Sequence, residues 1–276
     1  MAVKSALINV MEKAARKAAR GLIRDFGEVE QLQVSKKGPA DYVSAADLKA
    51  EKVLREELGR ARPDFGFLLE EGGEIPGATG RHRWLVDPLD GTTNFLHGIP
   101  HFCIAIAVER TEDRGHETDI TAGLVYDPLR DEMFWCEKGA GAYVNDRRLR
   151  VSARRKLSEA VIATGIPVQN KADHETFLAR LAAVMKVSSG VLRAGAAALD
   201  LAYVAAGRYE GFWETGLNPW DIAPGVLLVR EAGGYVTEIG GGHNMFETGS
   251  ILAANGQLHA EIGEVLRGAL SVKASP

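Results

Sequence analysis

One short segment constrains the fold of this chain more than any other, because it joins a strand, two acids and a helix start. Residues 84–95 read Trp-Leu-Val-Asp-Pro-Leu-Asp-Gly-Thr-Thr-Asn-Phe. The apolar beginning is typical of a buried strand, and the proline and glycine indicate a turn before a possible helix. Asp87 and Asp90 are therefore expected on a rigid turn at the end of a core strand, facing one point.

The oxygen atoms of this turn suit a hard cation. Mg²⁺ prefers oxygen ligands and keeps some of its waters, so Asp87, Asp90 and the carbonyl of Leu89 could bind it together. The amides of residues 91–93 would begin a helix whose N-terminus can hold a phosphate group. Asp-Pro and Asp-Gly are also common turn pairs, and a plain turn is the simpler interpretation of an isolated match.

Acidic residues also occur at two further ends of predicted elements, one at the end of a strand and one at the start of a helix. Glu70 and Glu71 follow the apolar residues 67–69, where adjacent like charges cost energy unless a cation or solvent relieves them. Asp221 lies shortly before Pro224, which cannot donate a backbone hydrogen bond and is expected in the first turn of a helix. Each site also has a simpler interpretation, a solvated strand end for the glutamate pair and a helix N-cap for Asp221.

The rest of the chain alternates helices and strands. Helical periodicity predicts helices over residues 3–26 and 44–58, the second opened by Ser44 and Asp47 at the spacing of a capping box. Further strands or helices are expected at 101–108, 121–125, 132–136, 160–164, 175–187, 196–206, 210–213, 222–232 and 235–238. The pattern predicts layered α and β structure, with helices on a largely antiparallel sheet in the first half, and not a Rossmann domain.

Composition narrows the range of partners. The formal charge of -4 gives the chain no general attraction for nucleic acid, so small-molecule chemistry is favoured. Cys103 and Cys136 are the only cysteines, too few for a disulfide framework or a four-cysteine zinc site. The sequence has no apolar run of about 18 residues that could span a membrane and no secretion-signal pattern, so a cytoplasmic protein is expected.

Taken together, the three acidic segments resemble the inositol monophosphatase family, which carries Glu-Glu, then Asp-Pro-Ile/Leu-Asp-Gly-Thr, then Trp-Asp. The resemblance covers nearly the whole chain, since residues 41–47, 139–142 and 195–214 also look like their family counterparts. It implies a five-layer αβαβα sandwich of the inositol monophosphatase and fructose-1,6-bisphosphatase type. Residues 1–148 would form an N-terminal α+β lobe with the first two motifs, and residues 149–276 a C-terminal α/β lobe with Trp-Asp and the substrate residues.

The resemblance also implies a set of metal ligands. Glu70, Asp87 and the Leu89 carbonyl would hold one Mg²⁺ ion. Asp87, Asp90 and Asp221 would hold a second ion, and Glu70 would contact a weaker third. The cofactor expected from the resemblance is therefore Mg²⁺, as two or three ions.

The same resemblance assigns the phosphate end of the site. Gly91 and Thr92 would contact the phosphate, and Asp221 would also contact the substrate. Thr92 and Glu70 would orient the attacking water, and Asp47 would accept a hydrogen bond from Thr92. Glu70, Thr92 and Asp47 are thus the expected catalytic residues, although Asp47 could equally be a helix cap or do both.

At the alcohol end, the resemblance assigns Glu214 to the hydroxyl groups of the substrate. The backbone around Gly195 and Ala197 would face the alcohol ring. Two positions depart from the family pattern, because Ala196 stands where many relatives have Ser or Thr, and Ala46 where many have Thr. Hydroxyl contacts from those positions are absent, so the preferred alcohol is less constrained.

The implied activity is magnesium-dependent hydrolysis of a phosphate monoester, with inositol monophosphate as the expected substrate. Fructose 1,6-bisphosphate, histidinol phosphate and 3′-phosphoadenosine 5′-phosphate are the alternatives within the superfamily, whose members share the metal motif. A regulatory binding protein in transcription or ribosome assembly is an alternative of a different class. Relatives are commonly dimers inhibited by lithium, so a lithium-sensitive homodimer is expected.

Overall fold

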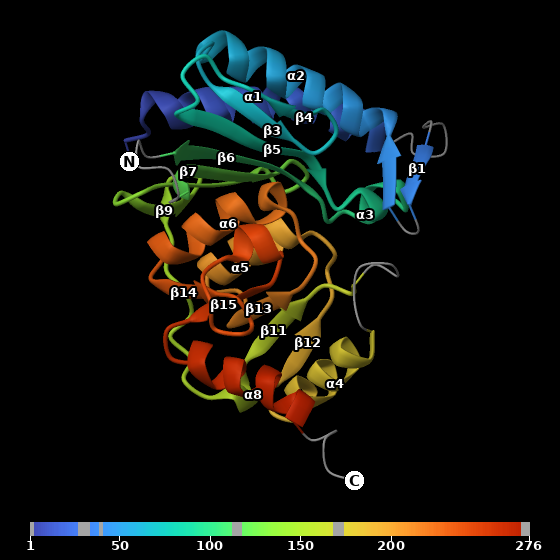
Figure 1. Ribbon diagram of the computed structural model, residues 1–276, viewed down its shortest axis with the longest axis vertical. Helices are drawn as coiled ribbons and strands as arrows, with labels where there is room; N and C mark the ends of the chain where they lie inside the picture. The colour runs from blue at the N-terminus through green and yellow to red at the C-terminus, as the bar shows by residue number, and fades with distance from the viewer. Residues whose placement is uncertain (1–2, 27–33, 39–40, 112–117, 168–173, 272–276) are drawn as a thin grey trace.

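The computed structural model describes residues 3–26, 34–38, 41–111, 118–167 and 174–271. Within these ranges, two large β-sheets alternate with three layers of helices along the long axis of the molecule (Figure 1), and residues 34–38 and 41–44 pair as a separate two-stranded antiparallel sheet. The order helix, sheet, helix, sheet, helix is the five-layer αβαβα sandwich predicted from the sequence.

The helices and strands follow one another closely. The helices are α1 (Ala6–Phe26), α2 (Ala45–Ala61), α3 (Thr92–Leu96), α4 (His174–Met185), α5 (Ala197–Ala205), α6 (Pro219–Glu231), α7 (Met245–Thr248) and α8 (His259–Ser271). The strands are β1 (Val34–Gly38), β2 (Asp41–Ser44), β3 (Gly66–Leu69), β4 (Gly73–Ile75), β5 (His82–Asp90), β6 (Cys103–Thr111), β7 (Thr118–Asp127), β8 (Glu132–Glu137), β9 (Gly141–Val144), β10 (Arg147–Arg148), β11 (Val161–Thr164), β12 (Gly190–Leu192), β13 (Gly211–Glu214), β14 (Gly234–Thr237) and β15 (Ile251–Asn255). The sequence-based assignment ended at residue 238 and therefore missed α7, β15 and α8.

Each of the two large sheets contains parallel neighbours. The larger sheet has the order β10-β9-β8-β7-β6-β5-β3-β4, with β3 and β5 parallel and its other neighbours antiparallel. The smaller sheet has the order β12-β11-β13-β15-β14, with β11 parallel to both β12 and β13. Parallel strands end at the same edge of a sheet, so the residues that follow them lie close together.

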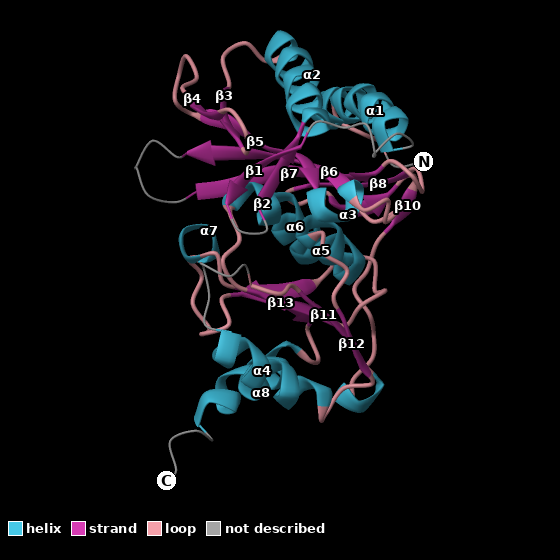
Figure 2. Ribbon diagram, turned by 90° about the vertical axis from the view of Figure 1, so that its right-hand side faces the viewer, coloured by secondary structure: helices cyan, strands magenta, loops and turns pink. Residues whose placement is uncertain are grey.

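Helices α1 and α2 cover the outer face of the larger sheet (Figure 2). The start of α1 is fixed by Ser5, whose Oγ accepts a hydrogen bond from the amide of Ile8 at 3.2 Å, as an N-cap does. Val3 precedes this cap and is 94% exposed, so the predicted start at residue 3 is three residues early. Helix α2 begins at Ala45 and extends three residues beyond the predicted Leu58, while the side chain of Ser44 lies outside the described residues.

Helices α5 and α6 form the middle layer and pack on both sheets. A single cluster of buried side chains joins Leu85 of the larger sheet, Leu201 of α5, Val226 of α6 and Phe212 of the smaller sheet. The hydrophobic core therefore continues across the middle of the molecule. The predicted division of the chain after residue 148 stays a prediction.

None of the helices within the described ranges combines the length and the apolar character that crossing a bilayer requires.

Candidate active site

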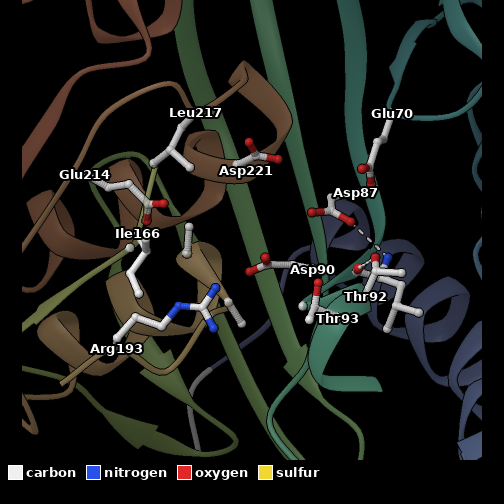
Figure 3. Close-up of a pocket in the computed structure, with 16 residues that line it drawn as sticks. Glu70, Asp87, Asp90, Thr92, Thr93, Ile166, Arg193, Glu214, Leu217 and Asp221 are labelled. Atoms are coloured by element: carbon white, nitrogen blue, oxygen red, sulfur yellow. Dashed lines mark hydrogen bonds between the residues drawn. The ribbon is translucent and has the colours of Figure 1, made fainter. Parts of the chain in front are cut away.

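A pocket lies where the ends of several strands from the two sheets meet the first turns of α5 and α6. Of the residues predicted for the site, ten line this pocket: Glu70, Asp87, Leu89, Asp90, Gly91, Thr92, Gly195, Ala197, Glu214 and Asp221. In Figure 3, Glu70, Asp87 and Thr92 lie on one side, and Glu214, Ile166 and Arg193 lie on the other. Asp90 and Asp221 lie between them, so the pocket has two chemically different ends.

The acids of the first side are placed by the parallel pair β3 and β5. Leu69 lies opposite Val86 in the register, and the amide of Glu70 donates to the carbonyl of Val86 at 3.2 Å. Glu70 therefore follows its strand directly beside Asp87. The turn after Asp87 is held by its own carboxylate, since Oδ1 accepts a hydrogen bond from the amide of Leu89 at 2.9 Å.

Asp90 links the turn to the other half of the molecule. Its Oδ2 accepts a hydrogen bond from the amide of Ala198, in the first turn of α5, at 2.7 Å. The buried Asn94 adds a second link, because its Nδ2 donates to the carbonyls of His101 and Ala194, each at 2.8 Å. An amide nitrogen carries two hydrogens, so both bonds can form at once and fix the loop before α5.

Like charges meet at these carboxyl groups. Burial raises the pKa of Asp87 well above its usual range, and the neighbouring Glu70, Asp90 and Asp221 raise it further. Burial also raises the pKa of Asp90, to about 6, although the hydrogen bond from the amide of Ala198 acts in the opposite direction. A bound cation would relieve this repulsion and favour the ionised carboxylates.

The donor set fits a hard divalent cation. It consists of carboxylate oxygens together with the Leu89 carbonyl, which are the ligands that Mg²⁺ prefers. In the described part of the chain, no three His, Cys, Asp or Glu side chains already form a closed metal-binding group. The carboxylates line the walls of the pocket.

Asp221 lies near the start of its helix, as predicted, but the helix begins earlier than the sequence indicated. Helix α6 begins at Pro219, and Asp221 Oδ2 accepts the backbone amide of the N-cap residue Asn218 at 2.7 Å. The sequence predicted Pro224 in the first turn of this helix, and that prediction is wrong. Pro224 lies in the second turn. The earlier proline at the first helical position already suits the helix start, and the burial of α6 favours continued helix through Pro224.

Thr92 connects the pocket to α2. Its hydroxyl lies 3.0 Å from Oδ1 of Asp47 and 3.0 Å from the carbonyl of Leu89, and it shares its proton between these acceptors. Asp47 lies behind the pocket wall and is fully buried. Gly91 has φ of 93°, which glycine adopts without strain, and it opens α3, a helix of only five residues. The short helix contributes amide donors rather than a large dipole.

Thr93, whose amide was expected at the phosphate, also lines the pocket, and four further lining residues escaped the sequence analysis: Gly165, Ile166, Arg193 and Leu217. Gly165 and Ile166 follow β11, and Arg193 follows β12. In α/β proteins, ligands bind at the carboxyl ends of parallel strands. Knowledge that these strands pair in parallel would therefore have indicated the residues that follow them as site residues. The sequence did not reveal that pairing.

Glu214 ends β13 on the far side of the pocket. Removal from solvent raises the pKa of Glu214 well above its usual range, the nearby Asp200, Asp90 and Asp221 raise it further, and Arg193 acts in the opposite direction. Glu214 is thus held among other acids with one basic neighbour on its side of the pocket (Figure 3).

Known proteins resemble this chain in sequence and fold. The profile of the inositol monophosphatase family matches residues 3–271. An inositol-1-monophosphatase of Mesorhizobium japonicum is 54% identical, covering 98% of this chain and 99% of the relative. The crystal structure of the extragenic suppressor protein suhB from Bartonella henselae is 55% identical with a TM-score of 0.91, covering 95% of this chain and 99% of that one.

A Nus factor SuhB of Pseudomonas aeruginosa is 42% identical, covering 90% of this chain and 91% of the relative. The profile match and these identities over nearly the full length agree on the family of this chain. The chain belongs to the inositol monophosphatase family.

Proposed function

We propose that this protein hydrolyses phosphate monoesters with the help of Mg²⁺, and that inositol monophosphate is its preferred substrate. The observation that carries the proposal is the meeting of Glu70, Asp87, Asp90 and Asp221 around one pocket, from three separate elements of the fold. Membership in the inositol monophosphatase family supports the substrate, as does the name of the relative that is 54% identical.

Two or three Mg²⁺ ions would be held by these four carboxylates and the Leu89 carbonyl. That carbonyl also accepts the Thr92 hydroxyl, but a carbonyl oxygen has two lone pairs and can serve both. Bound magnesium would polarise the phosphate and neutralise charge on the leaving alkoxide. The amides of Gly91 and Thr92 would add hydrogen bonds to the phosphate oxygens.

The nucleophile is a water molecule held by Glu70 and Thr92, with Asp47 orienting the Thr92 hydroxyl. The water oxygen attacks phosphorus and the bond from phosphorus to the ester oxygen breaks, so that one water proton ends on the departing alcohol and the other stays with the phosphate product. At the opposite end, Glu214 and the backbone of Gly195 and Ala197 would bind the alcohol. Asp221 would contact both metal and substrate.

The test is phosphate release from inositol 1-phosphate, fructose 1,6-bisphosphate, histidinol phosphate and adenosine 3′,5′-bisphosphate. We expect turnover with Mg²⁺, none after chelation, recovery on adding Mg²⁺ back, and the highest kcat/KM for inositol 1-phosphate. Magnesium-independent turnover would contradict the proposed site, and a clear preference for another ester would contradict the proposed substrate alone.

A regulatory role is the second candidate, because a relative 42% identical is named Nus factor SuhB. Replacement of Asp87 separates the two, since it removes a proposed metal ligand from inside the pocket and leaves the outer surface unchanged. A regulatory function would survive Asp87→Asn, whereas a function that depends on hydrolysis would not.

We also propose a cytoplasmic homodimer whose activity is inhibited by lithium. Exposed apolar side chains near the edge strand β12 support association, with Met185 and Leu192 exposed by 61% and 46%. Both cysteines are buried free thiols, which suits a reducing compartment. Light scattering tests the dimer, and phosphate release in lithium chloride tests the inhibition.

A further inference from the structure

The alcohol end of the pocket contains a basic side chain that the family resemblance did not assign. Arg193 is the only basic residue among the sixteen described residues that line the pocket, and five of the others are acids. Its guanidinium group points into the pocket on the same side as Glu214 (Figure 3). Arginine carries five N–H donors and no acceptor, whereas the carboxyl oxygens of Glu214 can accept hydrogen bonds.

The side chains of Glu214 and Arg193 each pack directly against a glycine. The carboxylate of Glu214 lies so close to Gly165 that a Cβ added there would be 1.8 Å from Oε1 and 2.2 Å from Oε2. The guanidinium of Arg193 lies over Gly195, where an added Cβ would be 2.8 Å from Nη1. Gly165 therefore provides space, while Gly195, at φ of 89°, provides space and an unusual backbone turn.

We propose that Arg193 is a specificity-determining residue that, together with Glu214, selects phosphate monoesters of polyhydroxylated alcohols. Arg193 donates hydrogen bonds to hydroxyl oxygens of the alcohol, and Glu214 accepts hydrogen bonds from its hydroxyl protons. Gly165 is the positioning residue that keeps the Glu214 carboxylate in place. The inference rests on the proposed phosphatase function and names the residues that choose its substrate.

Charge favours a neutral polyol over a second phosphate group at this end. A second anion next to Arg193 would also lie beside Glu214 and near the other acids of the pocket. Each hydroxyl group of a polyol is both donor and acceptor, so it can satisfy both side chains without adding charge. An ester whose alcohol has no hydroxyl leaves both side chains without these bonds, and such loss lowers binding.

The first experiment compares Arg193→Gln with the wild-type enzyme on inositol 1-phosphate and on phenyl phosphate, whose alcohol part offers no further hydroxyl. We expect kcat/KM for inositol 1-phosphate to fall about 10-fold, mainly through KM, and the value for phenyl phosphate to change less than about 2-fold. Arg155→Gln is the control, because it removes the same charge from an exposed position outside the pocket.

The second experiment uses Gly165→Ala, with Gly190→Ala as control because no atom lies within 4 Å of a Cβ added at Gly190. Gly165→Ala should displace the Glu214 carboxylate and lower the preference for inositol 1-phosphate as Glu214→Ala does. In the Glu214→Ala background it should cause no further loss, because the displaced group is gone.

Several outcomes would overturn the inference. These are equal losses on both esters in Arg193→Gln, no loss at all, or additive losses of Gly165→Ala and Glu214→Ala. A larger loss on fructose 1,6-bisphosphate than on inositol 1-phosphate would show that Arg193 binds a second anion instead. A wild-type enzyme that hydrolyses phenyl phosphate without preferring inositol 1-phosphate defeats this inference and the proposed substrate but leaves the proposed phosphatase activity standing, whereas one that hydrolyses neither ester also defeats that activity.

Discussion

The hydroxyl of Thr92, at the edge of the pocket, lies 3.0 Å from Oδ1 of the fully buried Asp47. Asp47 belongs to α2 on the outer face of the larger sheet, and Thr92 begins α3 after β5. Through this hydrogen bond, a residue of α2 orients the Thr92 hydroxyl on the side of the pocket where the proposed water is held.

Loss of Thr92 or of Asp47 should lower turnover for the same reason, since both residues position the attacking water. We expect Thr92→Ala and Asp47→Asn each to reduce kcat by about 10²–10⁴-fold, because both position one water. The double variant should be little worse than the poorer single variant. The measurement is a double-mutant cycle on kcat, with magnesium affinity followed by calorimetry. Fully additive losses, or loss of magnesium binding in Thr92→Ala, would show that the hydroxyl does not act through the water.

Asp90→Asn should remove activity and keep the fold. Asparagine retains an oxygen that can accept the Ala198 amide, but it lacks the charge that a metal site needs. We expect kcat at saturating Mg²⁺ to fall by more than about 100-fold, a loss of several kcal/mol in transition-state stabilisation, with an unchanged melting temperature. Asp146→Asn, at an exposed position away from the pocket, serves as the control. Near-normal turnover in Asp90→Asn would exclude Asp90 as a metal ligand.

The contact between α5 and α6 should not tolerate a side chain at Gly225. A Cβ added there would lie 2.5 Å from Cβ of Leu201, so Gly225→Ala should destabilise the protein by about 1–3 kcal/mol. Gly21→Ala in α1 meets no atom within 4 Å and should be neutral or stabilise by up to about 1 kcal/mol. Urea denaturation measures both changes. Equal stability of the two variants would show that the helix contact can relax.

Asp25 should contribute stability that depends on pH. Burial acts to raise the pKa of Asp25, but hydrogen bonds from Arg24 and Lys49 outweigh it and lower the pKa below its usual range. A lowered pKa in the folded state means that the stabilisation is present above the unfolded pKa of about 3.9 and is lost as pH falls through the folded value. Asp25→Asn should therefore be less stable than wild type at pH 7 and approach it near pH 3. A difference in urea midpoint that stays constant over that range would point to packing instead.

The local sequence determined much of the framework. The acids after residues 67–69 predicted a strand end that matches β3, and the apolar run before Asp87 predicted β5, although β5 continues through the expected turn to Asp90 with an irregular register after Asp87. Local signals suffice there, because alternation of apolar residues and turn-forming residues act over a few neighbours. Helix boundaries were less certain, as Ser5 and Pro219 show, since a cap depends on one hydrogen bond that several nearby residues could make.

By itself, the sequence determined the chemistry of the acids, the family and the kinds of element that hold them. Only the tertiary structure brought Arg193 and Gly165 to the pocket, because their places depend on the parallel pairing of β11 with β12 and β13. The same holds for the bond of Asn94 to the carbonyl of Ala194, which joins segments a hundred residues apart. Such contacts leave no periodic pattern in the chain, since they arise from the packing of whole layers and not from the preferences of neighbouring residues.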